Sequence, residues 1–262
     1  MFEQLTIEKP SKAKPVKKPS GFVFYRGPSL LDNKPIIGIA IVSKSGNSKT
    51  GNLVQTYILA DNGINPLLNA QSGNDDSICG DCKHRRYNGG ACYVNLGQGP
   101  YQVYKALARG SYPHDIEALK KAIQGRNVRI GSYGDPAAIP SVYWDVILQG
   151  AKGFTGYSHQ WQNLCGENRG IMRYCMASVD STLEKIKAQS LGYRTFRVAQ
   201  LGNKELLSGE FVCPASAEAG QKVTCADCLA CHGGIDTRKA SPVIQVHGIL
   251  KKRFIQVQQV QA

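Results

Sequence analysis

The sequence predicts an α/β protein of parallel βα units, forming a partial or distorted TIM-like barrel with an N-terminal β-hairpin and cysteine-rich loops. Two observations lead to this expectation. Runs rich in Val, Ile, Thr and Tyr alternate with helical stretches along the second half of the chain, which is typical of a parallel sheet with crossover helices. Nine cysteines lie mostly in two groups outside that alternation. Periodicity does not distinguish an open sheet from a partial barrel.

The expected strands are short runs of β-branched, aromatic and other apolar residues bounded by turn residues. They span residues 38–44, 52–60, 128–134, 154–159, 174–180, 193–199, 210–215 and 243–249. The first two flank the turn-rich, basic loop SGNSKTG and should form a β-hairpin with a basic tip. The loop lacks the spacing of a phosphate-binding P-loop and precedes a strand rather than a helix.

The expected helices show an apolar face or capping residues at their ends. They span residues 100–110, 115–125, 140–153 and 181–192. Asp115 is placed to cap the second helix, and Ser181 with Glu184 forms a capping-box pattern at the start of the fourth. An apolar face of that fourth helix is marked by Leu183, Ile186 and Leu191.

The chain of 262 residues divides into a flexible basic arm, residues 1–20, and a single α/β metal-binding domain, residues 21–262. Three prolines and few apolar residues argue against packing in the arm. We find neither an apolar run long enough for a membrane span nor a secretory leader. The expected location is therefore the cytoplasm of a bacterial host, where structural disulfides are rare.

The net charge is +13, with a sequence pI of about 9.3. Such an excess of Lys and Arg favours a polyanionic partner, DNA or RNA, although a generic solvated basic surface is the simpler alternative. The candidate nucleic-acid-binding residues come from the arm and the hairpin loop. They are Lys14, Lys17, Lys18, Lys44 and Lys49.

The second cysteine group consists of the three cysteines of CADCLAC and one that precedes this stretch: Cys225, Cys228, Cys231 and Cys213. Thiolates at C-x₂-C spacing suit tetrahedral Zn²⁺ or an iron–sulfur cluster, because a tight turn points both sulfurs at one centre. Four sulfurs suffice for a closed site, and the adjacent His232 can replace one of them. A free-thiol or redox loop is the alternative.

The first cysteine group comprises Cys79, Cys82 and Cys92, in a glycine-rich segment. Three sulfurs need a fourth ligand, for which His84 and the more distant Cys165 and Cys175 are candidates. Zinc and iron–sulfur both remain open. Neither group has the C-x₃-C-x₂-C spacing of radical S-adenosylmethionine enzymes, so the spacing does not support that chemistry.

Four polar residues lie at or near the ends of the expected strands: Asp135, His159, Asp180 and, in or just after RTF, Arg197. Ligands of parallel α/β folds meet the carboxyl ends of the strands, so these residues are the catalytic candidates for acid–base chemistry or anion binding. Each also has a simpler explanation, as a turn residue, a helix-start residue or a satisfied histidine.

The motif order resembles that of a group of bacteriophage and mobile-element proteins. The shared stretches are CGDCKHR, GGACYVN, RIGSYGDPAAIP, YSHQW, MASVDS, RTFRVA, CPAS and CADCLAC, over roughly residues 20 to 250. The resemblance implies a cysteine-rich, barrel-like domain similar to the radical S-adenosylmethionine fold but without its cysteine triad. It carries no established activity and so transfers no catalytic residue.

Three functions follow from these observations. The first is a nucleic-acid-binding metalloprotein, with zinc or an iron–sulfur cluster, in the DNA replication or metabolism of a phage or mobile element. The second is a radical-S-adenosylmethionine-like or other metal-dependent enzyme that modifies a nucleotide or a nucleic-acid base. The third is a structural metalloprotein that binds a host protein. The sequence favours the first, because of the charge and the basic arm.

Overall fold

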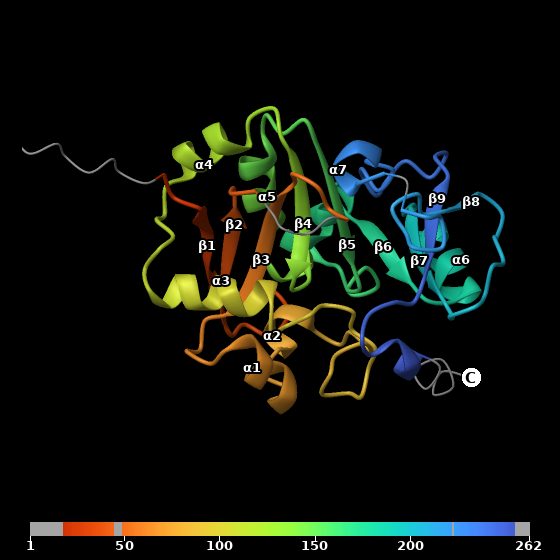
Figure 1. Cartoon of the computed structure of the whole chain (residues 1–262), viewed down its shortest axis with the longest axis horizontal. Coiled ribbons are helices and arrows are strands. Elements are labelled where there is room, and N and C mark those ends of the chain that lie inside the picture. Colours follow the sequence, from red (N-terminus) through yellow and green to blue (C-terminus); the bar gives the residue numbers. More distant parts are fainter. Residues whose placement is uncertain (1–17, 45–48, 222, 255–262) are drawn as a thin grey trace, which may run out of the picture.

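Nine strands form one mostly parallel sheet in the computed structural model of this chain, which describes residues 18–44, 49–221 and 223–254 (Figure 1). The strands are β1 (Gly21–Pro28), β2 (Pro35–Ile41), β3 (Val54–Ala60), β4 (Asn127–Tyr133), β5 (Gly153–Ser158), β6 (Met176–Val179), β7 (Thr195–Ala199), β8 (Glu210–Val212) and β9 (Ser241–Gln245). Their order is β1-β2-β3-β4-β5-β6-β7-β9-β8. The sheet is not closed, because β1 and β8 lie at its two edges. The predicted α/β class is confirmed.

The first three strands are antiparallel, and β3 to β9 run parallel. The pairing of β2 with β3 joins the two runs expected to form a hairpin, but residues 45–48 of its tip lie outside the described residues. The sequence reading missed β1, which pairs along β2. Most of the expected basic arm also lies outside the described part of the chain, which begins at residue 18.

Along the chain, α-helices follow β3, β4, β6 and β8 (Figure 1). They are α1 (Pro66–Ser72), α2 (Asp76–Cys79), α3 (Gly99–Ala108), α4 (Ile116–Ile123), α5 (Ser141–Leu148), α6 (Thr182–Ser190) and α7 (Cys225–Cys228), with 3₁₀ turns at Pro136–Ala138, Gly166–Arg173 and Lys251–Arg253. Both predicted caps are present. The Asp115 side chain accepts a hydrogen bond from the backbone N–H of Ala118 at 2.9 Å, and Ser181 accepts one from that of Glu184 at 3.1 Å.

The expected apolar face of α6 is not buried. Leu183 is 79% exposed and Ile186 is 58% exposed, whereas Lys185 and Ala188 lie inside. The Lys185 ammonium donates to the Ser208 carbonyl oxygen at 2.6 Å, which satisfies a charge that the hydrophobic pattern alone would place in solvent. The prediction for this helix was therefore correct for its position and wrong for its orientation.

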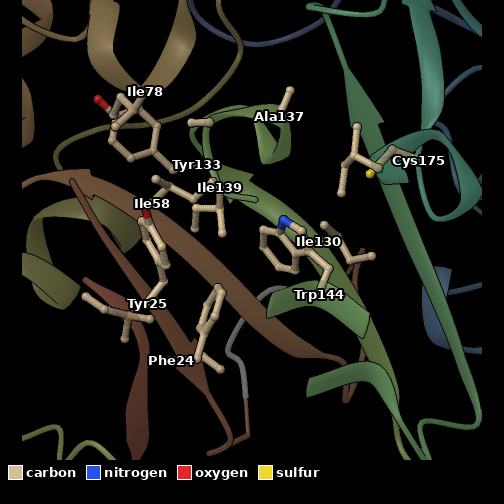
Figure 2. Close-up of a cluster of buried hydrophobic side chains, with 14 of the residues drawn as sticks. Phe24, Tyr25, Ile58, Ile78, Ile130, Tyr133, Ala137, Ile139, Trp144 and Cys175 are labelled. Atoms are coloured by element: carbon tan, nitrogen blue, oxygen red, sulfur yellow. The ribbon is translucent and has the colours of Figure 1, made fainter. Parts of the chain in front are cut away.

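The larger core packs α5 and neighbouring turns against the face of β1 to β4 shown in Figure 2. Trp144 is fully buried, 5.0 Å from the Phe24 ring between centroids, and its indole N–H donates to the Pro136 carbonyl oxygen at 3.1 Å. Ile130 points into this core. Because side chains alternate along a strand, Arg129 and Gly131 face the opposite side of the sheet. That opposite side carries the candidate site.

Among the described residues, no helix is both long and apolar enough to cross a lipid bilayer.

Candidate metal centres and the cavity between them

A cavity of about 470 Å³ lies on the side of the sheet opposite α5. Its wall includes Tyr57 from β3, Arg129 and Tyr133 from β4, and Thr155 and Tyr157 from β5. All seven cysteines of the two groups also line it: Cys79, Cys82, Cys92, Cys213, Cys225, Cys228 and Cys231. The fold therefore brings both cysteine groups, more than 120 residues apart in sequence, to one cavity.

The two groups approach the cavity from opposite ends of the strands. The segment after α2 lies near the carboxyl ends of β4 and β5, whereas α7 lies near their amino ends (Figure 1). Hydrogen bonds fix both placements. The Gln160 side chain donates to the Cys79 carbonyl oxygen at 3.0 Å, and the Asn127 side chain donates to that of Ala226 at 2.9 Å.

Around the first cysteine group, the loop is fixed by backbone and arginine contacts. The backbone N–H of Asp135 donates to the Ile78 carbonyl oxygen at 2.6 Å, and that of Cys92 donates to the His84 carbonyl oxygen at 3.0 Å. Arg85 binds the Asp75 carboxylate at 2.7 Å inside the loop. These contacts hold three cysteines near one another without a disulfide.

Burial keeps these thiols protonated. It raises the pKa of Cys79 well above its ordinary value, with further contributions from the charges of Asp75, Cys82 and Cys92. Burial likewise raises the pKa of Cys82 to about 12 and that of Cys92 to about 11. Thiolates would form here with the help of a cation, because a bound metal ion supplies the charge that desolvation denies them.

His84 has the contacts typical of a metal-binding histidine. Its Nε2 lies 2.6 Å from Oδ2 of Asp180, and its side chain is 10% exposed. Its Nδ1 is buried and has no hydrogen-bond partner among the described residues. Metal-binding histidines usually offer one ring nitrogen to the ion and the other to a carboxylate. Because buried polar atoms nearly always have a partner, the Nδ1 of His84 is a candidate metal ligand.

Among the fourth-ligand candidates, the structure therefore favours His84. The other two lie elsewhere: Cys165 is exposed, and Cys175 is buried in the larger hydrophobic core. Although burial acts to raise the pKa of Asp180, the hydrogen bond and charge of His84, together with the charge of Lys83, lower it to about 2. Asp180 is thus a carboxylate that orients the His84 ring.

The second cysteine group combines α7 with Cys213, which follows β8, and Cys231. Arg194 fixes the loop after α7 by donating to the carbonyl oxygens of Ala230, His232, Gly233 and Ala240. The Tyr157 hydroxyl donates to the Cys231 sulfur at 3.1 Å. Burial raises the pKa of Cys231 to about 12 and also raises that of Cys213.

His232 is engaged elsewhere. Its Nδ1 accepts a hydrogen bond from the backbone N–H of Phe154 at 3.3 Å, and its ring stacks on the Phe154 ring at 4.1 Å. The four sulfurs of the second group therefore form the better ligand set.

Within the described ranges, no three His, Cys, Asp or Glu side chains are arranged to hold a metal ion as they stand. All nine cysteines are described, and none of them forms a disulfide. The donor sets themselves fit zinc or an iron–sulfur cluster in number and type, as Cys₃His and Cys₄. Binding would require the thiols to lose their protons and converge on the ion.

Three of the four catalytic candidates gather at the cavity end that holds the first group. Asp135 and His159 line the cavity, and Asp180 contacts His84. The Asp135 carboxylate accepts hydrogen bonds from Ser158 Oγ at 2.8 Å and from the backbone N–H groups of His159 at 2.7 Å and Ala137 at 3.0 Å. Burial raises the pKa of Asp135. Asp135 thus holds the end of β5 against the turn after β4.

Arg197 does not join them. Its neighbours Phe196 and Val198 line the cavity, so strand alternation directs Arg197 to the other side of β7. There it binds the Glu210 carboxylate through two nitrogens, at 2.8 Å and 2.6 Å. Arg197 is thus part of a buried ion pair that lies outside the candidate site.

The candidate nucleic-acid-binding lysines do not lie together at the cavity. Lys14 and Lys17 lie outside the described residues, whereas Lys18 and Lys44 are exposed. Lys49 lines the cavity beside the second group, where its carbonyl oxygen accepts from the backbone N–H of Cys225 at 2.9 Å.

Sequence reasoning missed Arg129, Tyr157 and Arg194. For Arg129 a signal was present, because its charge interrupts the apolar run of β4 on the face opposite Val128 and Ile130. Arg194 carried no such signal, since its four carbonyl partners come from loops that tertiary structure brings together.

Compared with known protein families, with curated proteins and with solved structures, the chain shows no significant match.

Proposed function

We propose that this chain is a metal-dependent enzyme that acts on a nucleotide or a nucleic-acid base, with two cysteine-held metal centres at the ends of one cavity. The observation that carries the proposal is the shared lining. Both cysteine groups, His84, Asp135 and His159 face the same space of about 470 Å³. A purely structural metal site needs no such space, whereas small-molecule sites commonly measure about 300–1,000 Å³.

In this proposal the first centre, held by Cys79, Cys82 and Cys92, is the reactive one. It adjoins the polar strand-end residues, where ligands of parallel α/β folds bind. Zinc would act there as a Lewis acid, and an iron–sulfur cluster would transfer electrons. In this proposal the open sheet takes the place of the expected partial or distorted barrel. The motif order predicts an origin in a phage or mobile element.

The residues around the first centre have distinct roles. His159 is the candidate general acid or base, since it lines the cavity with its ring 5.8 Å from that of His84 between centroids. Asp135 is a positioning residue, because its carboxylate binds the backbone N–H of His159. His84 is the favoured fourth ligand, so a substrate group would have to join the metal as a fifth ligand or displace His84.

The test is metal analysis of protein purified without oxygen. We expect about two centres per chain if both groups bind, as zinc or as iron with sulfide. Cys82→Ser and Cys228→Ser should each lose one centre, and His84→Ala shows whether His84 is a ligand. Cys165→Ser is the matched control, because Cys165 is exposed and outside both groups. A metal-free native protein, or equal metal content in all variants, would contradict the proposal.

A second candidate function, nucleic-acid binding, is favoured by one local feature. Lys251, Lys252 and Arg253 are exposed immediately before Phe254, which lines the cavity and stacks on His84 at 5.5 Å. With the net charge of +13, this basic turn would place a polyanion beside the first centre.

For this candidate we expect affinity for single-stranded DNA to fall with salt. Replacing Lys251, Lys252 and Arg253 by Gln should reduce the slope of log affinity against log salt by up to about 2, since each phosphate contact contributes about 0.7. A control variant replaces three exposed cations elsewhere, Arg109, Lys121 and Lys204. Fluorescence anisotropy across salt measures both. Equal slopes for the two variants would remove the basic turn from the interface.

A further inference from the structure

The buried arginines of this protein have very different partners. Arg197 is paired with the Glu210 carboxylate at 2.6 Å, and Arg85 with that of Asp75 at 2.7 Å. Arg194 donates to four backbone carbonyl oxygens. A buried cation is costly unless a carboxylate neutralises it or several hydrogen bonds solvate it. Arg85 and Arg197 have a carboxylate, and Arg194 has four carbonyl oxygens at its two terminal nitrogens.

Arg129 is the exception. It is 8% exposed, yet within the described ranges no carboxylate lies within ion-pair distance of it. Its guanidinium donates to two neutral hydroxyls, those of Tyr93 at 3.0 Å and Tyr157 at 3.5 Å, and lies 4.7 Å from the Tyr157 ring centroid. The side chain also lines the cavity. An anion inside the cavity would supply the missing negative charge.

A second observation lies on the neighbouring strand. In the register of β4 and β5, Thr155 is paired with Arg129, so the two side chains share one face of the sheet. Thr155 is 2% exposed and lines the cavity, and its hydroxyl has no hydrogen-bond partner among the described residues. Tyr133 also lines the cavity, and its buried hydroxyl likewise has no hydrogen-bond partner among the described residues. Buried hydroxyls without partners are rare, and they fit a ligand that accepts hydrogen bonds.

We propose that Arg129 and Thr155 form a subsite for the phosphate group of a small-molecule ligand, with the tyrosines of the cavity wall packing against its ring system. Arginine suits phosphate because its planar fork presents several donors to the phosphate oxygens. Tyr57 and Tyr133 supply the aromatic wall beside it. The assignment deepens the proposed function, on which it rests for the cavity being the substrate site, and it specifies a mononucleotide.

The competing assignment for Arg129 is charge balance for the second centre. The Tyr157 hydroxyl contacts both the guanidinium and the Cys231 sulfur, so a thiolate centre would also lie near this cation. That role, however, leaves the Thr155 hydroxyl without a partner, whereas a phosphate bound beside Arg129 satisfies both groups. The phosphate assignment therefore accounts for more of the site.

The experiment is isothermal titration calorimetry of the metal-loaded full chain with AMP, adenosine and inorganic phosphate at constant ionic strength. We expect AMP to bind at least about tenfold more tightly than adenosine, because the phosphate–guanidinium contact is worth more than about 1.4 kcal/mol. Arg129→Gln should weaken AMP binding at least tenfold, and Thr155→Val several-fold. Arg238→Gln is the control, since the Arg238 side chain is 90% exposed.

The possible outcomes distinguish the phosphate subsite from a charge-balance role of Arg129 and from the proposed metalloenzyme function. Equal affinity of AMP for the native chain and for Arg129→Gln, or no AMP binding to the metal-loaded chain, would overturn the phosphate subsite. If Arg129→Gln fails to fold, Thr155→Val decides alone, because it keeps the shape of the side chain and removes the hydroxyl. Loss of the second centre's metal in Arg129→Gln, without AMP binding to the native chain, would assign Arg129 to charge balance. Metal content tests the proposed function separately, since a metal-free chain that binds AMP keeps the subsite and refutes the metalloenzyme.

Discussion

Removing metal from the purified protein is expected to unfold the part of the chain around the second centre while the rest remains folded. The hydrophobic cluster there is small, consisting of Met176, Phe196, Cys213, Ala215, Cys231 and Ile244. Two of its six members are proposed metal ligands. In small domains, the binding of structural zinc contributes about 10–16 kcal/mol of folding free energy. This exceeds what so few apolar side chains can supply by burial.

Hydrogen exchange measured by mass spectrometry checks this expectation. After chelation, amides of β7, β8 and β9 should lose protection, whereas those of β1 to β4, which pack on the larger core, should keep it. Adding the metal back should restore protection. Cys165→Ser, which keeps both cysteine groups intact, should behave like the native chain. Unchanged exchange in β8 and β9 after complete metal removal would show that the second group does not stabilise this region.

Glu210→Gln is expected to cost about 3–5 kcal/mol of unfolding free energy, because it leaves buried cations without their counter-ion. The Glu210 side chain is fully buried and binds Arg197 at 2.6 Å, with Lys185 at 3.9 Å. It also accepts a hydrogen bond from the backbone N–H of Leu207 at 2.9 Å. The neutral amide retains the shape of the carboxylate but cannot balance either charge.

Urea denaturation of both the variant and a matched control measures the cost. Glu117→Gln is the control, because its ion pair with Lys120 is exposed and should change stability by about 0.5 kcal/mol or less. A second arm replaces Arg197 with Met in the Glu210→Leu background, which removes both charges and should recover much of the loss. A cost below about 1 kcal/mol for Glu210→Gln would show that water reaches this pair.

Local patterns were sufficient for most elements of the fold. Apolar runs located β2 to β9, and capping residues located the starts of α4 and α6, because these signals act between residues a few positions apart. The edge strand β1 was missed. The apolar face assigned to α6 is exposed, because a buried ion pair beneath the helix takes Lys185 inside.

For the candidate site, the sequence by itself determined the donor types and their local grouping: two cysteine clusters, His84 beside one of them, and polar residues at the ends of parallel strands. Only the tertiary structure decided that both clusters face one cavity and that Arg197 lies on the other side of its strand. It also decided that Arg129 lies inside, where no carboxylate of the described residues pairs with it. The physical reason is that strand alternation fixes which residues share a face, whereas the packing of distant segments decides which face encloses the cavity.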